Sequence, residues 1–384
     1  MIHFICAFIR LISPPAKYLP PNQGETLQNR WKSSFSERAV DWVAAALRLL
    51  PPEAAHDLAI AFLKGGLATP FKTPELSMAS ALPTRVAGIG SLPHPIALAA
   101  GFDKQALAVS GLAQLGFSAV ELGTVTPLAQ SGNPKPRLFR VKDAHAVINR
   151  FGFNSQGMGA FADNLKAFDR RDLPQVKIGV NVGKNKQTPD ESAAKDFLIQ
   201  LRQFAPVADY LVVNLSSPNT PGLRGLAQPA FVAELSQNLD PQITGKVWIK
   251  FDPDSPKRDF QAVVESVEKN GFAGVVLTNT HRVEWPEAGG LSGAPLAVAS
   301  TQRLEWAYEV LQGRLPMIAS GGVMSGIDVF QKLARGASLV QVYTAMIYRG
   351  PWVVLKLLRE LDAEMRLRGF KSVQEVIGSH YIGG

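Results

Sequence analysis

Residues 208–224, ADYLVVNLSSPNTPGLR, hold the residue types in this chain that are best suited to chemistry. An apolar, β-branched run ends there in a crowd of amides and hydroxyls, which are Asn214, Ser216, Ser217, Asn219 and Thr220. Strands of α/β enzymes often end in such groups at a pocket. The same letters also fit an ordinary Asn/Ser/Pro-rich turn after a buried strand. The pocket interpretation gains weight because similar strand ends recur along the chain.

The other apolar runs end in neutral hydrogen-bonding groups, glycine or lysine. Their ends are Ala100-Gly101-Phe102-Asp103-Lys104, Gly123-Thr124, Asn181, Lys250, Thr278-Asn279-Thr280, Ser320-Gly321-Gly322 and Tyr343-Thr344. Neither histidine nor a pair of acids stands there, which disfavours metal ligation and two-carboxylate hydrolysis, so we expect no metal. Neutral hydrogen-bonding groups with Lys104 and Lys250 suit a flat heteroaromatic cofactor and a flat polar substrate. We expect Lys250 to face the flavin edge that becomes negative on reduction. We expect Gly321-Gly322 and Tyr343-Thr344 to form a phosphate site.

Eight apolar runs alternate with helical patterns and must position these ends. The predicted strands are Ile96–Ala100, Ala119–Leu122, Val176–Asn181, Tyr210–Asn214, Val247–Phe251, Gly274–Thr278, Pro316–Ala319 and Leu339–Tyr343. The predicted helices between them include Ala106–Leu115, Ser192–Phe204, Pro229–Asn238, Lys257–Asn270, Ser300–Gln312 and Ile327–Arg335. Eight βα units over roughly 260 residues favour an α/β fold of the (β/α)8 TIM barrel type. A doubly wound sheet is the alternative. A long insert containing GNPKPRLFR separates the second and third strands.

The N-terminal part has a different character. We expect residues 1–35 to be a flexible or anchoring segment, because the apolar run within it is too short to span a bilayer. Residues 36–70 predict an amphipathic helical hairpin, with Pro51-Pro52 between its helices and the second helix running from Glu53 to about Lys64. Its apolar surface exceeds one packing face, which indicates either packing on the main domain or contact with lipid or a lipophilic molecule. We expect the barrel to occupy 71–384.

The composition of the chain excludes several classes of protein. With 384 residues, 46% hydrophobic and 19% charged, the chain has enough apolar material for a large core and is not disordered. The net charge of +8 favours acidic small molecules or anionic lipid over nucleic acid, since no long Lys/Arg run and no nucleic-acid motif is present. The single cysteine, Cys6, excludes intrachain disulfides and cysteine-ligated clusters.

A series of stretches resembles the dihydroorotate dehydrogenases, and among them the membrane-associated, quinone-using class 2. In the expected order these are AAGFDK (99–104), ELGTVTP (121–127), GNPKPRLFR (132–140), INRFGFNSQG (148–157), GVNVGKNK (179–186), VNLSSPNTPGLR (213–224), LTNT (277–280), GGLSGAPL (289–296), SGGV (320–323) and GASLVQVYTA (336–345). The resemblance implies oxidation of (S)-dihydroorotate to orotate with FMN as hydride acceptor and a membrane quinone as final acceptor, in UMP biosynthesis. It further implies a monomer bound peripherally to the cytoplasmic face of a bacterial inner membrane, or to the mitochondrial inner membrane in a eukaryote.

The resemblance also assigns roles to positions. Ser217 matches the general base that removes the C5 proton of the substrate. The positions that match substrate contacts are Lys104, Asn149, Arg150, Phe151, Gly152, Phe153, Asn214, Asn219, Asn279 and Thr280. The positions that match FMN contacts are Ala100, Gly101, Thr124, Asn181, Asn214, Lys250, Thr278, Gly293, Gly322, Tyr343 and Thr344. His56 and Arg140 match polar residues of the quinone tunnel, and the hairpin is expected to serve the quinone half-reaction.

Ser217 separates the classes within the family. Cytosolic class 1 relatives use a cysteine at this position, and this chain has none after Cys6. A serine is a poor base at its ordinary pKa and needs a relay, such as a water or a threonine. The segment GLRGLAQPA (222–230) differs slightly from the usual form of the loop that covers the substrate, and Gln105-Ala106 follow Lys104 where small or acidic residues are more familiar in the family.

Two other functions fit part of the pattern. A non-catalytic barrel that binds a phosphorylated ligand would keep the glycines but has no need of Lys104 and Ser217 together. Another FMN barrel, such as a 2-hydroxy acid oxidase, needs a histidine near the flavin, and no strand end supplies one.

Overall fold

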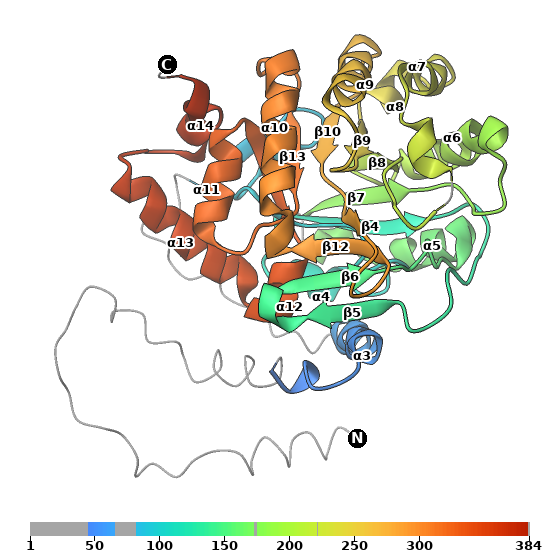
Figure 1. Cartoon of the computed structure of the whole chain (residues 1–384), viewed down its shortest axis with the longest axis horizontal. Coiled ribbons are helices and arrows are strands. Elements are labelled where there is room, and N and C mark those ends of the chain that lie inside the picture. The colour runs from blue at the N-terminus through green and yellow to red at the C-terminus, as the bar shows by residue number, and fades with distance from the viewer. Residues whose placement is uncertain (1–44, 66–81, 173–174, 221, 383–384) are drawn as a thin grey trace.

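The computed structural model describes residues 45–65, 82–172, 175–220 and 222–382. The flexible or anchoring segment 1–35 and most of the first hairpin helix lie outside the described residues. The expected boundary between hairpin and barrel, near residue 70, lies outside them as well. The described residues form one barrel with additional elements at both of its ends (Figure 1).

Eight parallel strands close into a barrel at the centre of the molecule. They are β3 (Ile96–Leu98), β4 (Ala119–Val125), β7 (Lys177–Val182), β8 (Tyr210–Asn214), β9 (Val247–Phe251), β10 (Gly274–Leu277), β13 (Met317–Ser320) and β14 (Ala337–Val342). Each pairs with the next along the chain, and β14 pairs with β3 to close the ring. The strands are buried on both faces, which explains why they appear as unbroken apolar runs. All eight predicted strands and the TIM barrel are confirmed.

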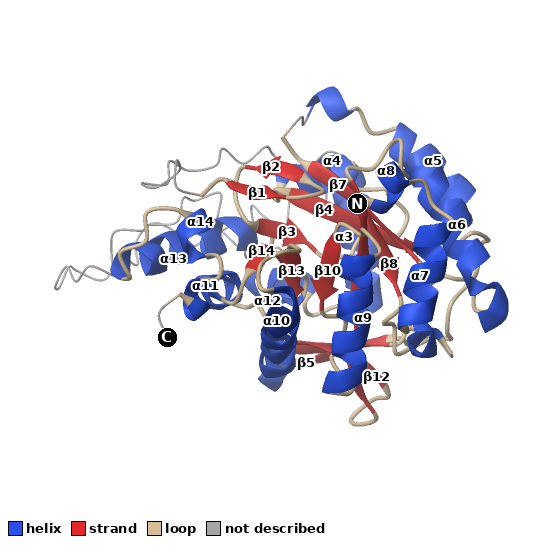
Figure 2. Ribbon diagram, turned by 90° about the horizontal axis from the view of Figure 1, so that it is seen from above, coloured by secondary structure: helices blue, strands red, loops and turns tan. Residues whose placement is uncertain are grey.

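Helices surround the strands (Figure 2). Those that follow barrel strands are α4 (Val109–Gln114), α5 (Gly157–Lys166), α6 (Ala193–Phe204), α7 (Pro229–Gln237), α8 (Pro241–Thr244), α9 (Lys257–Lys269), α10 (Ala297–Leu311), α11 (Gly326–Ala334), α12 (Thr344–Arg349), α13 (Val353–Leu367) and α14 (Val373–Val376). In α9, Phe260, Val263, Val264 and Val267 are buried, at the spacing of one helix face. The six predicted helices are present, with ends that differ by a few residues.

The amino end of the barrel is covered by an antiparallel pair, β1 (Thr84–Val86) and β2 (Gly90–Leu92). Val86 and Leu92 pack with Tyr210 and Trp248 of the barrel interior in one apolar cluster. This closes the end of the barrel opposite the predicted site.

The carboxyl end carries a second sheet that the sequence analysis does not predict. It has the order β11-β12-β6-β5 and consists of β5 (Leu138–Val141), β6 (Ala146–Asn149), β11 (His281–Val283) and β12 (Gly289–Gly293). Strands β5 and β6 come from the insert after β4, and β11 and β12 come from the connection between β10 and α10. Figure 1 shows β12, β6 and β5 stacked between the barrel and α3 (Pro52–Lys64).

Helix α3 is the predicted second helix of the hairpin. Its Ala55 and Leu63 are buried, and it contacts α4 and β5. Gly111 of α4 permits this approach, because a Cβ there would lie 2.5 Å from the carbonyl oxygen of Leu63. Leu58 and Phe62 remain 40% and 44% exposed. Within the ranges that the structure describes, no helix is both long and apolar enough to cross a bilayer.

Candidate active site

A cavity lies at the carboxyl ends of the barrel strands, and residues of β5, β6 and β12 complete its wall. It brings together most of the residues that the sequence analysis singles out. Those that line it are Ala100, Gly101, Lys104, Thr124, Asn149, Phe151, Gly152, Phe153, Asn214, Ser217, Asn219, Lys250, Thr278, Asn279, Thr280, Gly293, Gly322, Tyr343 and Thr344. Strand ends far apart in the sequence therefore meet at one place, as the barrel geometry requires.

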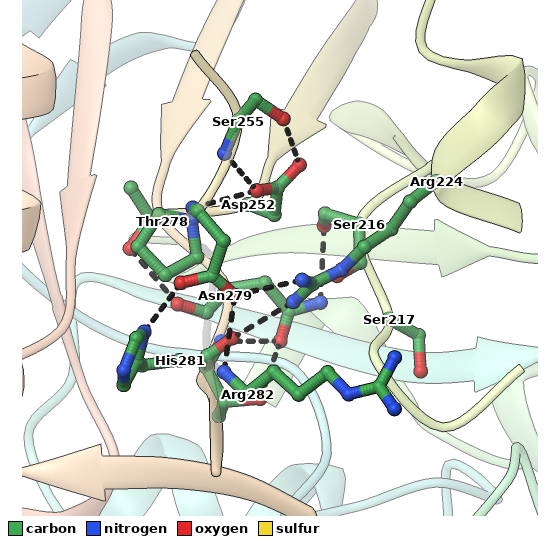
Figure 3. A network of polar contacts seen from close by, with 12 residues as sticks. Ser216, Ser217, Arg224, Asp252, Ser255, Thr278, Asn279, His281 and Arg282 are labelled. Atoms are coloured by element: carbon green, nitrogen blue, oxygen red, sulfur yellow. Dashed lines mark hydrogen bonds and ion pairs between the residues drawn. The ribbon is translucent and has the colours of Figure 1, made fainter.

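Asn214, the last residue of β8, is held by a network of side chains. Its amide nitrogen donates to Thr124 Oγ1 at 3.1 Å and to Asn181 Oδ1 at 3.2 Å. Its amide oxygen accepts from Ser216 Oγ at 2.9 Å and from Asn279 Nδ2 at 3.1 Å (Figure 3). Both ends of the amide are thus oriented before any ligand binds, which lowers the entropic cost of recognition.

Ser217 follows this network and lies beside it in Figure 3. Its side chain is buried, and its Oγ accepts the backbone N–H of Asn219 at 3.3 Å. In the same turn, the buried hydroxyl of Thr220 has no hydrogen-bond partner among the described residues. An unsatisfied buried hydroxyl is rare and marks a place where a water or a ligand group is expected.

The turn that carries Ser217 is fixed to the barrel by Arg224. Its guanidinium donates to the carbonyl oxygens of Ser216 and Thr280, both at 3.2 Å. A third donor reaches Asp254 Oδ2 at 2.7 Å. Sequence reasoning assigns no role to Arg224 or Asp254, because nothing in their spacing shows that they meet.

A second contact fixes the opposite side of the cavity. Asn219 donates its amide nitrogen to the backbone oxygen of Asn149 at 3.1 Å, and Asn149 in turn donates to the carbonyl of Gly290 at 3.3 Å. The turn after β8 is thereby joined to β6 and β12 across the mouth of the barrel.

Lys250 points into the barrel end from β9. Its side chain is buried, and its ammonium lies 3.9 Å from Glu121 Oε1. Burial lowers the pKa of Lys250, and the Glu121 carboxylate opposes this effect. Glu121 is fully buried and also accepts hydrogen bonds from Asn181, at 2.8 Å, and from Gln341. Sequence reasoning assigns no role to Glu121, although an acid inside an apolar strand is a signal that it has buried partners.

Lys104 is the second lysine in the cavity lining. Its ammonium is 3.9 Å from the centroid of the Phe151 ring, which is a cation–π contact. Burial lowers the pKa of Lys104 to about 8, and the charge of Arg137 adds to this effect. Glu53 of α3 opposes it. The ammonium of Lys104 is therefore a readily titrated group in the lining of the cavity.

Two glycines after β13 form a concave backbone surface. Gly322 has φ +76°, and a Cβ there would lie 2.1 Å from the Cα of Ala297, so that any side chain is excluded. Ala297 is the first residue of α10, and Gly293 and Thr344 line the same part of the cavity. Backbone N–H groups at a helix N-terminus beside glycines suit a phosphate.

The remaining predicted residues lie outside the cavity lining. Asn181 is fully buried below it and hydrogen-bonded to Thr124 Oγ1 at 2.6 Å. The Arg150 side chain pairs with Glu287 at 2.9 Å and faces away from the lining.

The two predicted quinone-tunnel residues lie near α3. The His56 ring contacts Phe102 with centroids 5.1 Å apart, and Phe102 contacts Tyr343 at 5.9 Å. These rings connect α3 to the cavity that Tyr343 lines. Arg140 of β5 donates to the carbonyl oxygens of Arg48 at 3.1 Å and Leu50 at 2.7 Å, which precede α3.

The arrangement can bind a flat anion and a flat, electron-accepting ring side by side. Amides suit ring edges that carry both donors and acceptors, and buried ammonium groups stabilise anions. No cluster of three or more potential metal ligands occurs in the described part of the chain.

The chain is similar to known proteins over most of its length. The family model described as "Dihydroorotate dehydrogenase" matches residues 81–365. A protein of Azorhizobium caulinodans named "Dihydroorotate dehydrogenase (quinone)" is 41% identical over 351 residues, covering 87% of this chain and 96% of that protein. The mouse protein "Dihydroorotate dehydrogenase (quinone), mitochondrial" is 42% identical over 355 residues, covering 87% of this chain and 88% of that protein.

Solved structures agree with this similarity. The crystal structure titled as DHODH in complex with ferulenol, from Eimeria tenella, superposes with a TM-score of 0.80 at 34% identity. The match covers 86% of this chain and 96% of that one.

Proposed function

The chain belongs to the dihydroorotate dehydrogenase family, and we propose that it performs the reaction of that family in the cavity described above with FMN as its flavin. It is an oxidoreductase of the quinone-dependent branch, which oxidises dihydroorotate to orotate in pyrimidine biosynthesis and passes the electrons to a quinone. Family membership implies a flavin cofactor. The identity of that flavin and the roles of individual residues are part of the proposal.

One observation carries the proposal. A serine, the buried Lys250, the half-buried Lys104 and several oriented asparagine amides from different strands converge on a single cavity. A barrel that only binds a phosphorylated ligand needs the glycines at its rim but has no use for Ser217 and Lys104 facing the same space. The cavity lining also contains no histidine, which argues against the 2-hydroxy acid oxidase alternative.

On the substrate side, Ser217 is proposed as the base that takes the C5 proton of dihydroorotate. The buried, unpartnered hydroxyl of Thr220 in the same turn supports a relay, and Thr220 is proposed to pass that proton on. The Lys104 ammonium offsets the substrate carboxylate. The amides of Asn149, Asn214, Asn219 and Asn279 bind the ring edge, with Thr280 and the backbone of 150–153 nearby.

On the cofactor side, the residues present fit FMN. The backbone at Gly322, with Gly293 and Thr344, would hold its phosphate. Lys250 would stabilise the ring edge that gains negative charge. The remaining proposed contacts are Ala100, Gly101, Thr124, Asn181, Asn214, Thr278 and Tyr343. When bound, the flavin accepts the hydride from the substrate.

On the quinone side, we assign the rings of His56, Phe102 and Tyr343 to the path between α3 and the flavin. Burial lowers the pKa of His56 to about 3, with Lys104 adding to the effect, so the imidazole is neutral at physiological pH. Arg140 provides a polar group beside this path and holds the chain before α3.

The exposed apolar side chains of α3, Leu58 and Phe62, are proposed to meet a membrane surface, together with Leu49, which is 84% exposed. The hairpin 36–70 then delivers the quinone to the barrel of 71–384. The protein is proposed to act as a monomer bound peripherally to the membrane that carries its quinone, on the cytoplasmic face if bacterial. Co-sedimentation with anionic vesicles and light scattering of the purified protein test these two points.

The experiment that tests the function is a coupled assay on the full chain. The purified protein is supplied with dihydroorotate and a lipophilic quinone, and formation of orotate and of quinol is measured in equal amounts. The released flavin is identified by chromatography, and we expect FMN at one molecule per chain. Orotate formation with NAD or fumarate but not with quinone, or release of FAD, would contradict the proposal.

A further inference from the structure

Lys332 of α11 is a buried lysine that the proposed reaction does not use. Its side chain is 2% exposed. Its ammonium donates to Ser300 Oγ at 2.6 Å, to Thr301 Oγ1 at 2.7 Å and to the carbonyl oxygen of Ala297 at 3.4 Å. All three acceptors are neutral and belong to the first turns of α10. Burying a charge among neutral partners is costly, so its presence needs a reason.

The nearby acids are engaged elsewhere. Asp328, one turn earlier in α11, accepts hydrogen bonds from Ser325 and from the backbone N–H of Met324 at the start of the helix. Glu305 of α10 pairs with Arg335 at 2.8 Å. Lys332 has no ion pair among the residues that the structure describes. Its charge is therefore poorly compensated in the protein alone.

The first turns of α10, which bind the Lys332 ammonium, also support the backbone of Gly321 and Gly322. The Ser300 hydroxyl contacts the carbonyl oxygen of Gly321 at 2.8 Å. Gly322 is packed against Ala297, whose Cα would be 2.1 Å from an added Cβ. The lysine is thus connected through the Ser300 hydroxyl to the backbone of Gly321, which lines the cavity.

Building on the proposed function, we propose that Lys332 is a positioning residue that supplies a positive charge behind the phosphate end of the flavin site. It does not touch the ligand. It acts through the field of its charge and through Ser300, which orients the Gly321 carbonyl away from the phosphate. A phosphate dianion in front of the glycines then provides the counter-charge that the protein lacks.

Two further observations agree with this role. Burial lowers the pKa of Lys332 to about 7, while Asp328 and Glu305 oppose the effect and Arg335 adds to it. An anion bound nearby would favour the charged form. Two hydroxyl groups on α10 could also be joined to α11 by a neutral side chain, so packing alone does not call for an ammonium.

The test compares FMN with riboflavin, which lacks the phosphate. The full chain is stripped of flavin, and the dissociation constants of both flavins are measured by fluorescence. In Lys332→Met, the affinity for FMN is expected to fall by at least about tenfold, because a charge in low-dielectric surroundings is lost. The affinity for riboflavin is expected to stay within about twofold.

Matched variants separate charge from packing. Lys332→Gln keeps a hydrogen-bond donor without the charge and should behave like the Met variant, which also covers the case that Lys332→Met fails to fold. Lys257→Met removes a surface lysine paired with Glu309 and should change neither constant. Unchanged FMN affinity, or equal losses for FMN and riboflavin, would overturn the inference. A wild-type chain that binds neither flavin would instead overturn the proposed function.

Discussion

Ser217 reaches the cavity with a hydroxyl that is held by one long contact, from the Asn219 N–H at 3.3 Å. We predict that Ser217→Ala slows reduction of the flavin by dihydroorotate by at least about 10²-fold, the usual scale for loss of a general base. FMN content and orotate affinity should stay near wild-type values, because few bonds are lost. Stopped-flow absorbance under anaerobic conditions measures the rate.

Substitution by cysteine is the informative partner variant. A thiol can act as a base, so Ser217→Cys should retain more activity than Ser217→Ala and should show an altered pH profile. Flavin reduction at the wild-type rate in the alanine variant would remove Ser217 from the mechanism.

We predict that orotate binding depends on pH because of Lys104. Its pKa of about 8 means that the ammonium is charged below pH 8 and loses its proton above it. The dissociation constant for orotate should therefore be constant below about pH 8 and rise about tenfold per pH unit above it. Lys104→Met should bind orotate weakly at every pH with a flat profile. The same rise in the Met variant would assign the dependence to another group.

At the residue level, sequence reasoning located the groups that stand at strand ends and missed those that support them. Ser217, Lys104 and Lys250 follow apolar runs, and the barrel rule brings such positions together. Glu121 and Arg224 act through partners that are distant in the sequence. Their contacts depend on the register of strands and the path of loops, which single-sequence patterns do not contain.

Among the elements, helix α3 is proposed to link the two half-reactions. Its Glu53 accepts a hydrogen bond from Arg137 Nε at 2.9 Å and forms an ion pair with Lys135 at 3.3 Å. Arg137 lowers the pKa of Lys104, and Glu53 opposes that effect. We predict that Glu53→Gln moves the fall in orotate affinity to lower pH, because the Arg137 charge is no longer offset.

Orotate titrations between about pH 6 and pH 9.5 measure this shift. The control is Glu309→Gln, which breaks a surface ion pair with Lys257 and should leave the profile unchanged. If the Glu53 and Glu309 variants give the same profile as wild type, α3 has no influence on the substrate side.

His56, on the same helix, should affect the other half-reaction. We predict that His56→Ala lowers turnover with a long-chain quinone severalfold and leaves turnover with a soluble dye unchanged, because its ring lies on the path to Tyr343 through Phe102. The pKa of His56 near 3 implies that the defect is the same between about pH 5 and pH 8. Equal losses with both acceptors would mean that His56 has a structural role.

The sheet β11-β12-β6-β5 was beyond sequence reasoning for a physical reason. Its strands are short, and β5, β11 and β12 contain arginine, glycine or serine, so neither alternation nor a long apolar run marks them. The two local pairs β5–β6 and β11–β12 are joined by β12 and β6 across a large separation, with Asn149 opposite Gly290. The sequence analysis recognised their motifs through the family resemblance but gave them no secondary structure.

At the scale of the whole molecule, the barrel was the most predictable feature. Eight apolar runs separated by amphipathic helices leave few architectures in which every run is buried, and closure removes the sheet edges. The open alternative, a doubly wound sheet, was excluded by the pairing of β14 with β3. The division into hairpin and barrel near residue 70 remains a prediction, since 66–81 lie outside the described residues.

The central claim is that electrons pass from dihydroorotate to a flavin in one cavity, and then from the flavin to a quinone on the side of α3. The most direct measurement is the visible spectrum of the purified full chain without oxygen. The account predicts a yellow protein whose flavin absorbance bleaches on adding dihydroorotate and returns on adding a lipophilic quinone. A colourless protein, or flavin absorbance that is indifferent to dihydroorotate, would contradict it.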